Sequence, residues 1–235
     1  MRLRPAHELL DDDEGTPAEI KRGLDDLWWI NQHLGGVSSW RRLWTRFLAR
    51  APLPAEPLTL LDVGAGTGQV TAAHAAWLRQ RGCTVTALAL DRRLTHLRAP
   101  VPALAADANR LPFADASLDL VTCNLFLHHF HDQPGNPVAS RLLQEMLRVA
   151  RRGVLINDLE RSWWPYLAIR AMSPGFSRLT RHDGPRSVAQ AYTRRELEVL
   201  AGASGAARFE VLRLPRFRLG LIMWPLPPKP RYDAL

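Results

Sequence analysis

A glycine-rich turn follows the first apolar strand that the sequence predicts. The stretch Asp62-Val63-Gly64-Ala65-Gly66-Thr67-Gly68 places glycine at every second position, between an apolar run over 58–63 and a helical pattern over 67–81. Glycine accepts positive φ and has no Cβ, so such a loop lets the backbone approach a ligand closely. Dinucleotide-binding folds use a related G-x-G-x-x-G turn, but here Gln69 stands in place of the third glycine. The loop therefore predicts a small-molecule site at the start of a helix.

Two acidic residues follow the next two predicted strands. Asp91 closes the run over 84–90, where its carboxylate can accept hydrogen bonds from both hydroxyls of a ribose. Asp107 follows a weaker strand over 101–106 and begins the polar turn 107–113. Asp91 alone indicates a ligand that contains adenosine without saying which one. The turn 107–113 narrows the choice of ligand.

A histidine cluster follows the strand predicted over 118–124. A neutral imidazole can take a proton from a phenol, so His128 and His129 are candidates for a general base. With His131 and Asp132 they also resemble metal ligands, but adjacent histidines usually point apart and no second cluster is evident. We therefore expect no metal. A purely structural role for the pair is the alternative.

The elements that position these residues alternate between short buried strands and amphipathic segments from residue 58 onward. This pattern is typical of βαβ units. Two helical segments precede it, one from Pro17 until Gly35-Gly36 stops it and one over about 38–50. We expect an α/β fold: a Rossmann-like, doubly wound, mostly parallel seven-stranded sheet with an antiparallel last strand and an N-terminal helical cap. The expected parts are a cap or lid over 1–54, a main domain over 55–224 with a possible substrate-cap insertion at about 159–205, and a proline-rich tail over 225–235. The polar stretch 178–185 is expected to be a turn-forming loop.

The composition fits one full-size soluble domain, with 235 residues, 46% hydrophobic and 23% charged. The net charge of +8 comes from scattered arginines, so nucleic acid is not the expected partner. Both cysteines fall in or beside apolar runs, without disulfide or zinc spacing. The chain start leads into acidic residues rather than an apolar signal region, and no apolar run reaches the roughly 18 residues of a membrane span. A cytoplasmic protein is therefore expected.

Taken in order, the motifs resemble those of class I S-adenosylmethionine (SAM)-dependent methyltransferases. They are most similar to the type 11 branch, which contains the ubiquinone and menaquinone biosynthesis methyltransferases. The resemblance covers about residues 58–158 and rests on Leu60 to Gly68, Asp91, Ala106 to Ala108, Leu111 to Phe113 and Leu118 to Val121. It implies SAM as cofactor and S-adenosylhomocysteine as product.

The same resemblance implies cofactor roles for individual residues. Gly64 and Gly66 would hold the methionine end, with Asp62 orienting the loop and the amino group. A second group of implied contacts places Asp91 on the ribose and Asp107 on the adenine. The full implied set is Asp62, Gly64, Ala65, Gly66, Gly68, Asp91, Arg92, Asp107, Ala108 and Asn124, the last beside the methionine amino group or the sulfonium.

The expected function is methyl transfer to oxygen or carbon of a small apolar aromatic metabolite of the phenol, quinone or polyketide type. The Asn/Asp-Pro-Pro-aromatic turn of nitrogen methylation and the Pro-Cys nucleophile of RNA cytosine enzymes are both missing, which favours a small substrate. The candidate substrate residues are Trp28, Trp29, Asp158, Trp163, Arg181 and His182. An RNA or protein methyltransferase, on the strength of the charge, and a non-catalytic SAM-binding module are the alternatives. The oligomeric state is not predicted.

Overall fold

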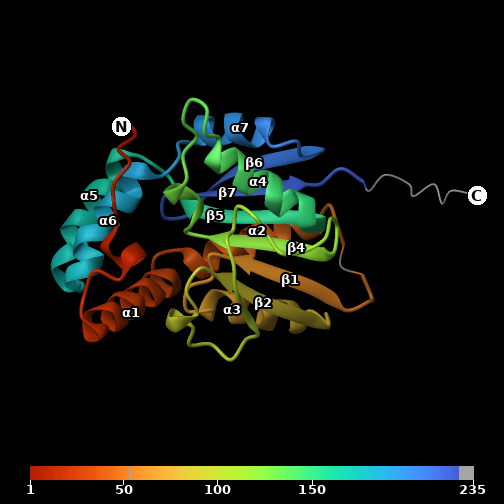
Figure 1. The fold of residues 1–235 in the computed structure, drawn as a ribbon, viewed down its shortest axis with the longest axis horizontal. Coiled ribbons are helices and arrows are strands. Elements are labelled where there is room, and N and C mark those ends of the chain that lie inside the picture. The colour runs from red at the N-terminus through yellow and green to blue at the C-terminus, as the bar shows by residue number, and fades with distance from the viewer. Residues whose placement is uncertain (53, 228–235) are drawn as a thin grey trace, which may run out of the picture.

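Seven strands form one mixed sheet in the computed structural model, which describes residues 1–52 and 54–227. The strands are β1 (Leu58–Val63), β2 (Val85–Asp91), β3 (Ala103–Ala105), β4 (Leu118–Asn124), β5 (Ala150–Leu159), β6 (Arg208–Leu214) and β7 (Arg218–Trp224). They lie in the order β3-β2-β1-β4-β5-β7-β6 (Figure 1). All pairs are parallel except those of β7, which runs antiparallel to both β5 and β6. The expected seven-stranded sheet is confirmed.

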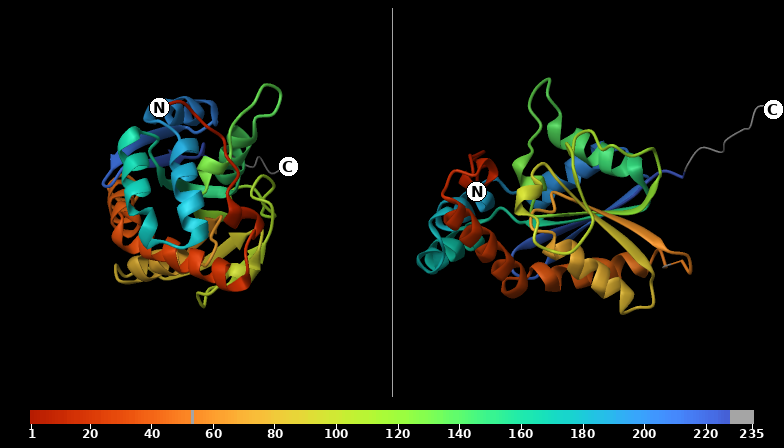
Figure 2. Two further views of the ribbon diagram at one scale, coloured as in Figure 1. Left: turned by 90° about the vertical axis from the view of Figure 1, so that its left-hand side faces the viewer. Right: turned by 60° about the horizontal axis from the view of Figure 1, so that its bottom comes forward.

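Helices cover both faces of the sheet, as expected for a doubly wound fold. They are α1 (Pro17–His33), α2 (Gly36–Leu48), α3 (Gln69–Arg79), α4 (Val138–Val149), α5 (Trp163–Met172), α6 (Arg178–Gln190) and α7 (Arg194–Ala203). One core lies between the sheet and α4 with α7, and a second lies between the sheet and α2 with α3 (Figure 2, right). The first turn of α1 carries a capping box, in which Thr16 and Glu19 satisfy each other's backbone N–H groups.

The cap is assembled from segments far apart in the chain. In Figure 1, α1, α5 and α6 gather at one end of the molecule, and contacts join α1 to α6 and α5 to α6. By contrast, α2 packs on the sheet, where Leu43, Trp44 and Phe47 are fully buried. The structure thus divides the predicted 1–54 cap, because the apolar face of α2 completes a core of the main domain.

The stretch 178–185 is helical, so the expectation of a loop is wrong. Ser177 caps α6 by accepting a hydrogen bond from the backbone of Thr180, and the helix continues through Pro185. Its buried face includes Asp183, whose two carboxylate oxygens accept hydrogen bonds from the backbone N–H groups of Leu9 (2.9 Å) and Leu10 (3.1 Å). A polar residue on the inner face, with the Gly184-Pro185 pair beside it, hides the helical pattern.

The chain start runs across the cap as a strap, which we define as residues 1–15. A short 3-10 turn, Leu9–Asp12, lies within it, and Arg4 donates its backbone N–H to the carbonyl of Ala189 at the end of α6. No helix in residues 1–52 and 54–227 is long and apolar enough to cross a membrane. Of the predicted tail, 225–227 are described, and 228–235 lie outside the described residues.

Candidate functional site

A cavity of about 1200 Å³ opens where β1, β2 and β4 end, beneath the cap. The strand order reverses between β1 and β4, and open α/β sheets bind ligands at such a switch point. The volume exceeds the roughly 300–1,000 Å³ of ordinary ligand pockets, so it has room for more than one small molecule. The glycine loop, the two acidic strand ends and the histidine cluster all contribute to its lining.

The three glycines of the loop have different tasks, although all have positive φ. A Cβ on Gly64 would lie 2.4 Å from the ring of Phe126, so this position is fixed by packing. Gly66 lines the cavity, and a Cβ built on it would meet no atom within 4 Å. Gly68 caps α3 and does not line the cavity. Of the three, Gly66 therefore has the most open space beside its backbone.

Asp91 fixes the loop as well as facing the cavity. Its Oδ2 accepts the backbone N–H of Gly66 (2.8 Å), and its Oδ1 accepts that of Arg93 (3.0 Å). Each carboxylate oxygen retains a further lone pair, so the predicted bonds to ribose hydroxyls remain possible. Asp107 is exposed at the cavity edge and uses Oδ1 to accept the backbone N–H of Asn109 (2.9 Å).

Asp62 is buried behind the loop. Oδ2 accepts from the hydroxyl of Thr71 (2.6 Å) and Oδ1 from that of Thr122 (2.8 Å), so it ties β1 to α3 and β4. Burial raises the pKa of its carboxyl, and the two hydroxyl hydrogen bonds offset part of that effect. This arrangement supports the predicted role in orienting the loop. Arg92, also predicted for the cofactor, lines the cavity and donates to the Asp11 carbonyl (2.8 Å) in the strap.

Asn124 lies at the exit of β4 in an amide network. Its Oδ1 accepts from the indole N–H of Trp40 (2.9 Å) and from Asn157 (2.9 Å), while its Nδ2 donates to Asn31 (3.3 Å). The oxygen that could accept from a cofactor amino group is thus already engaged. Asn124 lines the cavity, but its geometry favours holding α1 and α2 against the strand ends. The sequence reveals neither Asn31 nor the Trp40 N–H as members of this network.

His128 is oriented by a buried carboxylate. Its Nδ1 donates to Oδ1 of Asp158 (2.6 Å), and its backbone N–H donates to Oδ2 (3.0 Å). Burial alone would raise the pKa of Asp158, but the charge and hydrogen bonds of His128 outweigh it and lower that pKa. The Nε2 atom makes no hydrogen bond within the described residues and lies 3.8 Å from Oε1 of Glu8. This is the arrangement of an imidazole held in one tautomer with its second nitrogen free.

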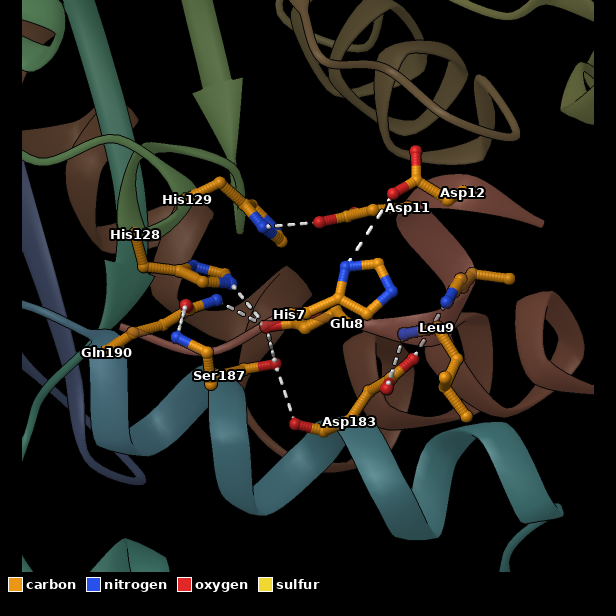
Figure 3. A network of polar contacts seen from close by, with 12 residues as sticks. His7, Glu8, Leu9, Asp11, Asp12, His128, His129, Asp183, Ser187 and Gln190 are labelled. Carbon is orange, nitrogen blue, oxygen red and sulfur yellow. Dashed lines mark hydrogen bonds and ion pairs between the residues drawn. The ribbon is translucent and has the colours of Figure 1, made fainter. Parts of the chain in front are cut away.

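His129 lies beside His128 rather than pointing away, which corrects the expectation for adjacent histidines. The ring centroids are 4.3 Å apart, and Nδ1 of His129 lies 3.0 Å from Oδ2 of Asp11. Figure 3 shows both rings directed at the strap, where Glu8 and Asp11 meet them. The two histidines therefore couple the end of β4 to the chain start.

Glu8, His128 and His129 offer donor atoms within 4.8 Å of one another, close enough for a metal site. However, the Glu8 oxygen nearest His128, Oε1, already accepts from Ser187 Oγ (2.7 Å) and Gln190 Nε2 (2.6 Å). Two donors occupy the lone pairs with which that oxygen would bind a cation. The geometry therefore favours a hydrogen-bonded cluster that can bind and release protons over a metal centre.

Glu8 is the functional residue that the sequence does not reveal. Its side chain is buried against α6, and this burial raises the pKa of its carboxyl to about 7, with His129 and Ser187 acting in the opposite direction. A carboxyl that titrates near neutrality can exchange protons at working pH. Glu8 lies in a segment without helical or strand periodicity, and only the folded strap brings it to the histidines.

The raised pKa of Glu8 predicts a pH-dependent stability. The pKa of Glu8 is 4.5 in the unfolded chain and about 7 in the folded chain. The contribution of this carboxyl to the free energy of unfolding is therefore complete below about pH 4.5 and is lost as the pH rises to 7. The loss amounts to at most about 3 kcal/mol. We expect Glu8→Gln to become more stable relative to the native chain over this window, as measured by urea unfolding at pH 4.5 and 7.5. The control is Glu198→Gln on α7, where the half-exposed Glu198 pairs with Arg194 one helical turn earlier, and a Glu8→Gln curve parallel to the native one would contradict the prediction.

The predicted substrate residues separate into two groups. Trp28 lines the cavity, and Asp158 acts behind His128. The other four do not line it: Trp29 stacks on His33, Trp163 is exposed, and Arg181 and His182 lie on other faces of α6. Apolar residues of the cap replace them, namely Leu24, Leu27, Ile30, Ile169, Met172 and Val188.

Comparisons with known proteins agree with this geometry. Residues 61–156 match the family described as methyltransferase domain. The demethylmenaquinone methyltransferase of Mycobacterium sp. (strain KMS) is 38% identical over 97 residues, which cover 40% of this chain and 37% of that protein. The ubiquinone/menaquinone biosynthesis C-methyltransferase UbiE of Laribacter hongkongensis (strain HLHK9) is 26% identical over 167 residues, covering 66% and 64%. The chain thus spans less than two thirds of the length of these curated relatives.

A solved structure extends the likeness in fold to nearly the whole chain. The plantazolicin methyltransferase BpumL, in complex with a pentazolic desmethylPZN analog and SAH, matches with a TM-score of 0.63 at 13% identity, covering 93% of this chain and 94% of that one. At such a low sequence identity, the match shows that the two folds are similar and shows nothing further. Sheet order, glycine loop and family match agree with one another: residues 61–156 match the methyltransferase domain family and are similar to the class I SAM-dependent methyltransferases of the type 11 branch.

Proposed function

We propose that the chain transfers the methyl group of SAM to an oxygen or carbon of a small, largely apolar aromatic acceptor. One observation carries the proposal. A single cavity of about 1200 Å³ combines the glycine loop and its acidic partners with an apolar wall from the cap and one proton-accepting cluster. Methyl transfer to a phenol or a quinone precursor needs these three parts together.

The cofactor side of the cavity fits SAM. The open space above Gly66 admits a ligand against the backbone, and Asp91 and Asp107 retain free lone pairs for hydroxyl and amino groups. When bound there, SAM supplies an electrophilic methyl group on a positively charged sulfur. Asp62 and Asp91 would hold the loop in place through their bonds to Thr71 and to the Gly66 backbone.

The acceptor side is apolar. Leu24, Leu27 and Trp28 of α1 face the cavity together with Ile169 and Met172 of α5. Such walls exclude water and suit a flat ring or an aliphatic chain. Several arginines near the mouth are paired with acids of α1 and the strap: Arg92 and Arg93 with Asp12, Arg93 also with Asp13, and Arg98 with Asp25. A polyanion would have to displace these pairs, which favours a small acceptor over RNA.

His128 is the proposed general base. Asp158 accepts a hydrogen bond from Nδ1–H and so leaves the lone pair on Nε2 free to take the proton of an acceptor hydroxyl in the cavity that His128 lines. Removing that proton raises the electron density of the acceptor oxygen and of the ring carbons next to it. Glu8, 3.8 Å from Nε2, stabilises the imidazolium that results. The proton-accepting group therefore serves either oxygen or carbon methylation.

A product screen tests the proposal. The chain with SAM is incubated separately with phenols, reduced quinones, RNA and a protein pool, and methylated product is detected by mass spectrometry. We expect product from the aromatic pool only. Product from RNA, with polynucleotide affinity that falls steeply as salt rises, would replace it with the nucleic-acid function. SAM binding by calorimetry without product in any pool would favour a non-catalytic SAM-binding module.

A further inference from the structure

Helix α5 is apolar on all sides and yet lies at the surface. Arg170 is its only charged residue, and Pro165 is its only buried one. Trp163 is 55% exposed, Trp164 74% and Leu167 54%. A helix that is apolar all round is ordinarily buried in a core or in lipid. The exposed apolar side chains of α5 are therefore expected to be covered by another molecule, because no part of the cap covers them.

The two faces of α5 have different surroundings. Pro165, Ala168, Ile169 and Met172 follow a helical spacing and line the cavity. The opposite side, with Trp163, Trp164 and Leu167, forms what we call the outer face. Figure 2 (left) looks onto this end of the molecule, where α5 and α6 stand side by side in front of the domain. One helix thus separates the interior of the cavity from the outside.

Positive charge surrounds the outer face. Helices α5 and α6 together carry Arg170, Arg178, Arg181 and Arg186 but only one acidic residue, Asp183, which is buried and bonded to the strap. Arg178 pairs with Glu19, while Arg170 and Arg181 are exposed and form no ion pair within the described residues. The strap adds exposed Arg2 and Arg4, of which Arg4 bonds to the end of α6, while its acidic residues lie further along, at positions 8 and 11–14.

We propose that the outer face of α5 docks on the surface of an anionic lipid bilayer. Tryptophan side chains favour the boundary between headgroups and acyl chains, because each joins a large apolar ring to an N–H donor. Arginines near a membrane surface are attracted to the negative charge of acidic lipids. The outer face combines both features on one protruding helix. In this orientation the cavity lies directly behind the docked helix, within reach of a lipophilic acceptor.

A second copy of the chain fits this face less well. The exposed parts of Trp163, Trp164 and Leu167 amount to roughly 400 Å². A stable protein interface buries about 800 Å² on each partner, and its core is poor in charged residues. The arginines that border the outer face would repel their equivalents across a two-fold axis. The docking does not depend on the proposed methyl transfer, so either can fail without the other.

Vesicle flotation tests the docking with the full chain. Vesicles of phosphatidylcholine alone are compared with vesicles that also contain phosphatidylglycerol. We expect the chain to float with the anionic vesicles, and the double variant Trp163→Ser/Trp164→Ser to lower the partition coefficient at least about tenfold. Arg170→Gln should reduce the preference for anionic lipid. The matched control is Val199→Ser on α7, which removes an apolar side chain that is 69% exposed outside the cap.

Two further measurements keep the result interpretable. Circular dichroism and SAM calorimetry must be unchanged in the double tryptophan variant, which shows that the domain is intact. Equal flotation of this variant and the native chain would overturn the proposal. So would a dimer in lipid-free solution that the same double substitution dissociates, because the outer face would then be covered by a second copy.

Discussion

Gly66→Val is expected to weaken SAM binding at least about 100-fold, to the point where calorimetry detects no heat of binding. A Cβ at this position meets no protein atom within 4 Å, because the space beside it belongs to the cavity. Two branched methyl groups would occupy the volume that the cofactor needs. The substitution also places a branched side chain on a residue whose φ is +52°, which strains the backbone. This strain acts where the Gly66 N–H donates to Asp91 at 2.8 Å.

The strain of positive φ must be separated from the blocked cavity. Gly205 provides the matched control, because it also has positive φ (+83°) and a Cβ there also meets nothing within 4 Å, but it lies in the turn after α7. Both valine variants lose roughly 1–2 kcal/mol of stability from the left-handed backbone. Only Gly66→Val should lose SAM. Native affinity in Gly66→Val, or an equal loss in Gly205→Val, would contradict the assignment of the loop.

The sheet could be predicted because its signals are local. β1 and β4 occupy the residues that their apolar runs predict, and the glycine loop and acidic strand ends follow from the same βαβ pattern. The helix 178–190 could not, since its buried face holds Asp183 and its middle holds Gly184-Pro185. The polarity of that face makes sense only when the strap is in place, because Asp183 bonds to the backbone of residues far away in the chain.

The candidate site likewise has one part with local sequence signals and one part that depends on tertiary contacts. The residues predicted for the cofactor lie within a few residues of strand ends, and all of them except Gly68 line the cavity. The acceptor side could not be predicted, because it is built by tertiary contacts among the strap, α1, α5 and α6. Residue type and place in the two flanking segments predict tryptophans at the substrate, but they do not say which face of a helix carries each one. Trp28 faces the cavity, whereas its neighbour Trp29, one helical step round α1, packs on His33 and Phe176.

The strap connects the cofactor half to the acceptor half. Arg92, next to Asp91, which is predicted to bind the ribose, donates to the Asp11 carbonyl, while the Asp11 carboxylate meets His129. Glu8, three residues earlier, lies beside His128. A movement of this segment would therefore alter both halves at once. The strap is also where the cavity could open, since its fixed points on α6 are the hydrogen bonds to Asp183, Ser187, Gln190 and the Ala189 carbonyl.

His128→Gln is expected to lower kcat about 100-fold or more while SAM affinity is unchanged, because general-base catalysis contributes roughly 10²–10⁴-fold. His128 faces the acceptor half, and none of its bonds touches the glycine loop. Glutamine keeps a polar group near Asp158, which limits the loss of stability. The test is single-turnover kinetics with an acceptor from the product screen, beside SAM calorimetry and thermal unfolding. Native turnover in a folded His128→Gln variant would show that His128 is not the general base.

Two variants distinguish a base from a packing role. Asp158→Asn should lower kcat to a similar extent and flatten the rising limb of the pH–kcat profile, because the buried carboxylate holds the His128 tautomer through a 2.6 Å bond. His129→Gln should cost much less, since the one side-chain partner of His129 in the part of the chain that the structure describes is Asp11 of the partly exposed strap. A packing role would reduce kcat in proportion to lost stability and leave the shape of the profile unchanged. Proton transfer at His128 predicts the opposite: an altered profile in the Asp158 variant at native SAM affinity.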